Sequence, residues 1–177
     1  FGIYNYFKSE DLVLREPDLE KWELGKWDTV DLLICNKKIN IKSTKFFGNL
    51  ALYETKDWNE EGLYIPNIDS DDGLYDYFAL VRISPNTDEL HKVIMGISKE
   101  GNFEEKLNNH IRSIKWCYDV PGYMTHNTMK WIIKNQRILP KNSLLNGKIR
   151  MDAENYYVET GDLKDIKQLS TELRLLD

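Results

Sequence analysis

The stretch from Val30 to Thr44 reads Val-Asp-Leu-Leu-Ile-Cys-Asn-Lys-Lys-Ile-Asn-Ile-Lys-Ser-Thr, and it predicts a β-hairpin. Its first six residues are almost continuously apolar, which is typical of a buried strand. Residues 36–38 predict a turn, and residues 39–44 alternate apolar and polar side chains as a half-buried strand does. We expect the rest of the fold to be built around this hairpin.

The face that each side chain occupies follows from the alternation along the second strand. Asn40 and Lys42 share one face, and the two isoleucines beside them share the other. A two-residue loop at 36–37 would place Asp31 opposite Lys42, whereas a loop at 37–38 changes the register but keeps Asp31 on the same face. A three-residue loop would put Asp31 on the opposite face.

Segments outside the hairpin predict further strands and helices. The expected strands are 49–53, 75–84 and 91–97, with extended pieces at 138–145 and 156–159, and the expected helices are 1–8, 102–116, 125–135 and 163–173. An irregular surface loop is expected at 58–73. Because strands come first and helices mostly later, we expect an α/β fold with a mixed β-sheet flanked by helices.

Length and composition narrow the class of protein. The 177 residues are enough for one domain, with a core at about 1–100 and a basic, helical part at about 101–177. No apolar run approaches the roughly 20 residues that a membrane span needs, so no membrane association is expected. Two cysteines favour neither a zinc site nor a disulfide framework, and they favour a cytoplasmic protein. The phosphate-binding and dinucleotide-binding glycine motifs are absent, so no nucleotide cofactor is expected.

Charge is divided unevenly along an acidic chain. The net charge is −5, yet residues 111–150 hold eight Lys and Arg against Asp119 alone. Lys130 and Lys134 are four residues apart, so they lie on one face of the helix expected at 125–135. That face, with Arg137 and the hairpin's Lys45, is the candidate surface for contact with DNA phosphates. The block also contains Trp116 and Trp131, which we expect in the core.

The shared polar face of the hairpin suits metal-assisted phosphodiester hydrolysis. Mg²⁺ prefers oxygen ligands, and Asp31, the Asn40 side chain and the Ile41 carbonyl offer three. Lys42 can hold the attacking water and offset the charge that develops on phosphorus. Asp31, Asn40 and Lys42 are therefore the candidate catalytic residues, and each also has a plain alternative role at a turn or an exposed strand.

The pattern resembles the PD-(D/E)xK nucleases, the restriction-endonuclease-like superfamily. That family has an Asp at the start of one strand and an acidic-x-Lys triplet on the next, often followed by Ser-Thr; here Asp31 precedes Asn40-Ile41-Lys42-Ser-Thr. Residue 30 is Val where the family usually has Pro, and residue 40 is Asn where it usually has an acid. The second departure weakens metal affinity, because it removes one negative charge.

The resemblance implies an Mg²⁺-dependent endonuclease for double-stranded DNA, most simply a homodimeric type II restriction enzyme. Two alternatives stay open: a DNA-binding domain without catalysis, and a repair or recombination nuclease that recognises DNA structure. Family members often add a helical Glu upstream of the motif, and Glu10, Glu20 and Glu23 are the options here. Glu54 is expected to be structural.

Overall fold

The computed structural model describes residues 2–16, 30–70, 73–97, 101–145 and 147–176. Within them the helices are α1 (Gly2–Lys8), α2 (Thr87–Gly96), α3 (Phe103–Ser113), α4 (His126–Lys134) and α5 (Ile166–Arg174), with short 3-10 helices η1 (Thr55–Asp57), η2 (Ile65–Ser70) and η3 (Thr160–Asp162). The strands are β1 (Leu32–Ile34), β2 (Lys37–Lys45), β3 (Leu50–Glu54), β4 (Tyr77–Ser84), β5 (Cys117–Thr125), β6 (Ile138–Leu139), β7 (Leu144–Leu145), β8 (Ile149–Arg150) and β9 (Asn155–Glu159).

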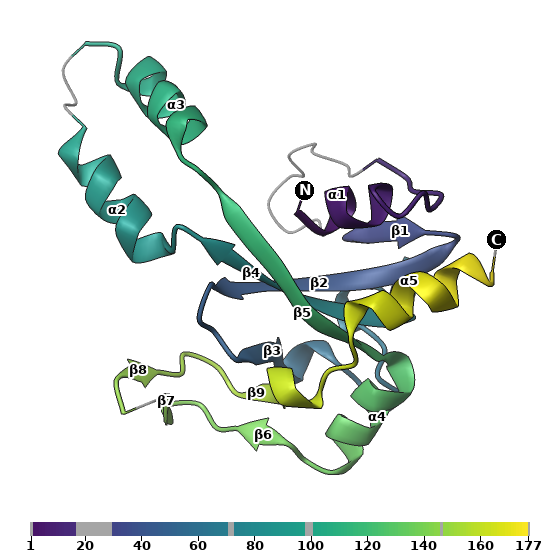
Figure 1. Ribbon diagram of the computed structural model, residues 1–177. Coiled ribbons are helices and arrows are strands. Elements are labelled where there is room, and N and C mark those ends of the chain that lie inside the picture. Colours follow the sequence, from purple (N-terminus) through teal and green to yellow (C-terminus); the bar gives the residue numbers. More distant parts are fainter. Residues whose placement is uncertain (1, 17–29, 71–72, 98–100, 146, 177) are drawn as a thin grey trace.

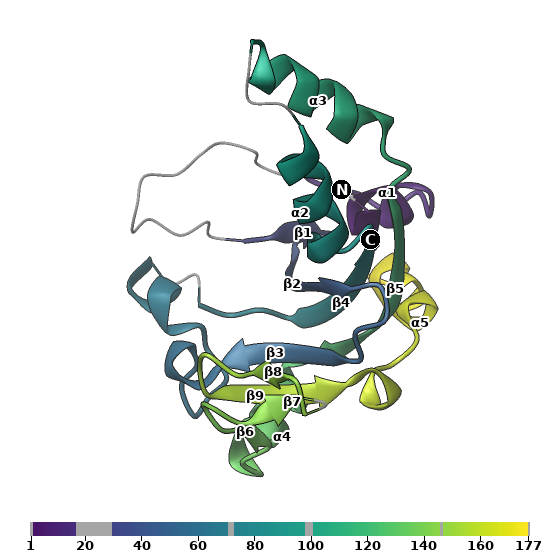
Figure 2. The ribbon, with the colours of Figure 1, turned by 90° about the vertical axis from the view of Figure 1, so that its left-hand side faces the viewer.

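The fold is mixed α/β, as the sequence predicts, and its centre is a mixed sheet (Figure 1). Its strand order is β1-β2-β4-β5, in which β2 and β4 run parallel and the other pairs run antiparallel. A second, antiparallel sheet has the order β3-β9-β6, and β7 and β8 form a separate small hairpin. Figure 2 shows the second sheet beneath the central one.

Each face of the central sheet has its own hydrophobic core, because side chains alternate along its strands. On one face, Ala79 and Val81 of β4 pack with buried side chains of α1 and α5. On the other face, Phe78 and Leu80 pack with the second sheet and α4. The hairpin β1–β2 lies at the edge of the central sheet. Its polar face is on the side of β3, beside the second core.

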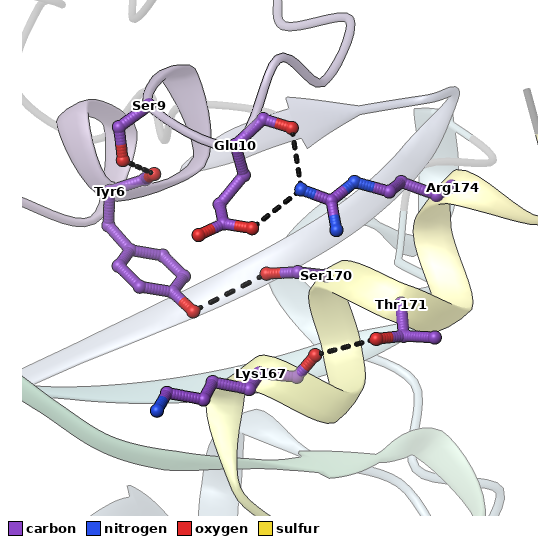
Figure 3. A network of polar contacts seen from close by, with 7 residues as sticks. All are labelled: Tyr6, Ser9, Glu10, Lys167, Ser170, Thr171 and Arg174. Atoms are coloured by element: carbon purple, nitrogen blue, oxygen red, sulfur yellow. Dashed lines mark hydrogen bonds and ion pairs between the residues drawn. The ribbon is translucent and has the colours of Figure 1, made fainter.

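Polar contacts join α5 to α1 and to the turn that follows α1 (Figure 3). One guanidinium nitrogen of Arg174 donates to the backbone carbonyl of Glu10 at 2.9 Å and to its carboxylate at 2.6 Å. The Ser170 hydroxyl lies 3.5 Å from the phenol oxygen of Tyr6. The expected helices 1–8 and 163–173 are confirmed as α1 and α5, and they cover the same face of the sheet.

Residues 85–97 and 101–116 form a helical arm between β4 and β5, and both ribbon views show its helices projecting from the body (Figures 1 and 2). Neither α2 nor α3 contains a buried residue. The strand expected at 91–97 is wrong, since this segment belongs to α2. Asn86 and Glu89 form a capping box at the start of α2, in which each side chain accepts a hydrogen bond from the backbone amide of the other residue. This pair of bonds favours the helix.

Two further differences concern the middle of the chain. Strand β5 was not expected, although it pairs along most of β4. The loop expected at 58–73 is more regular than predicted over residues 58–70, because it contains η2 and because Trp58 and Asn67 are buried; residues 71–72 lie outside the described residues. The helices expected at 102–116 and 125–135 are confirmed as α3 and α4, and Thr125 caps α4 by accepting from the Thr128 amide.

Among the described helices, none has both the length and the apolar character that crossing a membrane requires.

Candidate active site

The turn between β1 and β2 sets which side chains of the hairpin face each other. Cys35 and Asn36 form this turn, with φ angles of 46° and 58°. Positive φ at both central residues is the signature of a type I′ turn, whose twist matches that of the two strands. The ladder that follows pairs Leu32 with Ile39.

Continuing this register by one step places Asp31 opposite Asn40, with Lys42 two residues further along the same face. The expected turns at 36–37 and 37–38 are therefore wrong by one or two positions. The expected sharing of a face is confirmed, because the observed loop also has an even length. The shift in register brings Asp31 beside the amide of Asn40 instead of the ammonium of Lys42.

Asp31 is held against β2 by a main-chain contact. Its Oδ2 accepts a hydrogen bond from the Ile41 amide at 2.8 Å, in the position just before β1 begins. Since the amide and the carbonyl of a strand residue point to the same side, the Ile41 carbonyl also faces the β1 side of β2. The three expected oxygen donors thus lie at one edge of the hairpin.

Asn40 is the most unusual residue of this face. Asn40 is only 6% exposed, and its Oδ1 is buried without a hydrogen-bond partner among the described residues. A buried polar atom in this state costs about 1–3 kcal/mol of stability. Such an atom in a native structure calls for an explanation, and a bound ion or a functional role is among the usual ones.

Lys42 lies above an aromatic ring of the second sheet. Its Nζ is 5.5 Å from the centroid of the Tyr53 ring, and its side chain is half-buried. Tyr53 is 1% exposed, and burial together with the negative charge of Asp31 raises the pKa of its phenol. Asp31 and Lys42 are therefore both close to the buried side chain of Tyr53, which belongs to β3.

A further carboxylate reaches this neighbourhood from η1. Burial raises the pKa of Asp57, the charge of Glu54 raises it further, and the positive charges of Lys56 and Lys42 oppose the rise. Glu54 itself is engaged with Lys56, whose Nζ lies 2.7 Å from it, which fits its expected structural role. Sequence reasoning missed Asp57, because only the packing of β3 and η1 beside β2 brings it into range of Lys42.

The upstream glutamates remain apart from this constellation or outside the described residues. Glu10 is engaged by Arg174 of α5. Glu20 and Glu23 fall within residues 17–29, which the structure does not describe.

The donor set fits a hard divalent cation of the Mg²⁺ type. No group of three or more His, Cys, Asp or Glu residues within the described part of the chain could hold a metal ion. Mg²⁺, however, is usually held by only one or two carboxylates, with waters and substrate phosphates completing its shell. Asp31, the Ile41 carbonyl and the unpaired oxygen of Asn40 supply such a set.

The four basic residues expected to contact DNA do not form one patch. Lys45 is on β2, but it is three residues after Lys42 and therefore lies on the opposite face of the strand. The other three lie on or just after α4, against the second sheet. Within the described part of the chain, three of the four form ion pairs with carboxylates: Lys45–Asp88 at 2.7 Å, Lys130–Glu61 at 2.5 Å and Arg137–Asp162 at 2.8 Å.

The expectation that both tryptophans of the basic block are core residues is wrong. Trp116 is 46% exposed and Trp131 is 52% exposed. Trp116 lies in the arm, which has no buried side chain in its helices, and Trp131 is on the outer face of α4, whose inner face buries Met129, Ile132 and Ile133. The Trp131 indole and the exposed Lys134 side chain of α4 are therefore accessible on the surface, whereas Lys130 is engaged by Glu61.

Searches of known proteins found no matching family model, no matching curated protein and no matching solved structure.

Proposed function

We propose that the protein is an Mg²⁺-dependent endonuclease that hydrolyses phosphodiester bonds in double-stranded DNA, with a restriction-endonuclease-like fold. The observation that carries the proposal is the buried, unpaired Oδ1 of Asn40, which lies next to Asp31 in register and on the face of Lys42. A role as a metal ligand would account for this oxygen having no hydrogen-bond partner among the described residues. A sequence-specific, homodimeric and cytoplasmic type II restriction enzyme is the specific form that we propose.

The chain's own residues have separate tasks in this reaction. Asp31, Asn40 and the Ile41 carbonyl would hold the ion. When bound, Mg²⁺ supplies charge stabilisation at a phosphate oxygen and makes a bound water more acidic. Lys42 donates hydrogen bonds to the attacking water and offsets the charge that develops on the phosphate. The buried Tyr53 ring lies under the Lys42 ammonium and helps to hold it in place.

The direct test is cleavage of supercoiled plasmid in the presence and absence of Mg²⁺. Wild type should cut only with the metal, and Asp31→Ala should be inactive by orders of magnitude while keeping its fold by circular dichroism. Ser43→Ala is the matched control, because Ser43 follows Lys42 on β2 but is exposed on the opposite face. Cleavage by Asp31→Ala at the wild-type rate would refute the assigned site.

One observation favours a second candidate, a DNA-binding domain without catalysis. Asp31 is the only carboxylate among the three proposed ligands, since Asn40 stands where a second acid would strengthen metal binding. In that case, DNA binding without cleavage under any divalent metal is expected. Discrete plasmid fragments support a restriction enzyme, whereas cutting confined to junctions or branched DNA supports a structure-specific nuclease.

A further inference from the structure

A cavity of about 550 Å³ lies between the segment at 60–61 and the second half of α4. Its volume is within the range of small-ligand sites, which runs from about 300 to 1,000 Å³. Ile133, which is 4% exposed, gives the cavity an apolar base, and Trp131 and Lys134 form part of its wall. None of the proposed metal ligands lines this cavity, so it is separate from the candidate active site.

Trp131 presents a flat aromatic surface at this cavity. The indole is 52% exposed, although it is among the largest apolar side chains of the protein. It is not loosely placed, because the Arg137 guanidinium lies 5.9 Å from its ring centroid. Arg137 is fixed in turn by the Tyr157 ring, at 5.0 Å, and by its ion pair with Asp162. A preoriented, exposed aromatic ring suits stacking with a flat ligand.

The two lysines that line the cavity, Lys130 and Lys134, differ in their ion pairing. Lys130 is paired with Glu61. Lys134 is exposed, and no carboxylate among the described residues forms an ion pair with it. Glu60, also exposed, lines the same cavity and offers carboxylate oxygens to hydrogen-bond donors. The ligand that matches has a flat face, an anionic group and an N–H donor.

We propose that this cavity binds one nucleotide of a polynucleotide, with its base stacked on Trp131, its phosphate at Lys134 and an amino group of the base at Glu60. The inference rests on the proposed function, because it assigns a subsite for a nucleotide of the same DNA whose base stands outside the duplex, as a flipped or single-stranded base does. A sugar could also stack on the indole, but it would have no use for the unpaired ammonium of Lys134.

The position of the cavity relative to the active site supports this assignment. Glu60 belongs to the segment that starts with Asp57, and Trp58 between them packs edge-on against Tyr53 at 5.9 Å between ring centroids. An antiparallel bridge between Trp58 and Tyr64 closes this segment into a compact loop. One short, well-packed loop therefore connects the proposed nucleotide subsite with Tyr53, the ring that lies under Lys42.

The test is the affinity of short, fluorescently labelled single-stranded oligonucleotides, measured by anisotropy in EDTA. Trp131→Ala should weaken binding by about tenfold, as expected for the loss of one stacked base, and Trp131→Phe should recover part of the loss. Trp116→Ala, which removes the comparably exposed indole of the arm, is the matched control and should bind as wild type does. Lys134→Ala should reduce the salt dependence by the share of about one phosphate contact.

The base contact is tested with two pyrimidine sequences. Oligo-dC carries an exocyclic amino group that can donate to Glu60, whereas oligo-dT presents a carbonyl there. Oligo-dC should therefore bind several-fold more tightly, and Glu60→Gln should reduce the difference. Unchanged affinity of Trp131→Ala, or equal affinity of the two oligonucleotides for wild type, would overturn the proposal. Because EDTA prevents metal-dependent cleavage, an inactive protein that binds in this way would refute only the nuclease function.

Discussion

Replacing Asn40 by leucine should make the protein more stable and abolish cleavage of DNA. Leucine has a branched side chain like that of asparagine but no oxygen to leave unpaired at this buried position. Removing an unsatisfied buried oxygen recovers about 1–3 kcal/mol, and fitting the larger side chain offsets part of the gain. We expect a net increase of about 1 kcal/mol in the free energy of unfolding, and therefore a Tm higher by about 2–4 °C.

Mg²⁺ should have the opposite effect on the difference in stability, because it should raise the Tm of wild type and not that of Asn40→Leu. A ligand that binds only the folded state at ten times its Kd stabilises it by about 1.4 kcal/mol, which is about 3–6 °C for a chain of this length. Wild type should gain this increment with Mg²⁺, and Asn40→Leu should gain none. Asn40→Asp restores a second carboxylate, so it should bind Mg²⁺ more tightly than wild type does. Thermal unfolding with and without Mg²⁺ measures all three proteins.

Asn155 provides the matched control. It is as buried as Asn40, at 5% exposed, but its Nδ2 donates to the Ala153 carbonyl at 3.0 Å. Asn155→Leu should therefore destabilise the protein by about 1–2 kcal/mol, because it removes a satisfied hydrogen bond. If Asn40→Leu is destabilised to the same extent, or if it responds to Mg²⁺ as wild type does, the reasoning about the unpaired oxygen is wrong.

Three further changes probe separate parts of the molecule. Lys42→Ala should lower the cleavage rate by orders of magnitude and leave the Kd for DNA in EDTA nearly unchanged, because Lys42 acts on the chemical step. Single-turnover cleavage measures the rate and fluorescence anisotropy measures the Kd; a large loss of binding would contradict this role. Because the pKa of Asp57 is raised in the folded protein, its ionisation opposes folding, so Asp57→Asn should be more stable than wild type at pH 7 in urea. That advantage should shrink as the pH falls through the raised pKa and vanish below the ordinary value of 3.8; an advantage that grows toward low pH would be inconsistent with it. Arg174→Ala removes contacts to the backbone carbonyl and to the carboxylate of Glu10 and should lower the free energy of unfolding by about 0.5–1 kcal/mol in urea. No change would mean that the tie between α5 and the segment after α1 is dispensable.

The parts of the fold that could be predicted are those with local causes. The alternation along β2 put Asn40 and Lys42 on one face without any knowledge of the rest of the chain. The register could not be predicted in the same way, because Cys35-Asn36 lacks the Gly that usually marks a type I′ turn. Segment 91–97 looked like a strand because it holds β-branched residues, yet the Asn86 and Glu89 pair upstream was a readable helix start.

The candidate site divides in a similar way. Asp31, Asn40 and Lys42 are close in the sequence, so their shared face follows from one hairpin. Asp57 comes near Lys42 only through packing of β3 and η1 beside the central sheet, and no local pattern indicates such a contact. The exposure of Trp131 was equally hidden, because a large aromatic residue on an amphipathic helix is usually found on its buried side.

The arm, residues 85–97 and 101–116, lies outside both hydrophobic cores, so its length is weakly constrained by packing. Ser84 and Cys117 are paired in the β4–β5 ladder, so the arm leaves and re-enters the sheet at neighbouring positions. Its helices contribute no buried side chain to either hydrophobic core. The arm touches the hairpin through the ion pair of Asp88 with Lys45 at the far end of β2, but an insertion or deletion in it would reach neither Asp31, Asn40 and Lys42 nor the cavity beside α4. Descendants of this gene could therefore gain, lose or exchange the arm while keeping the same sheet.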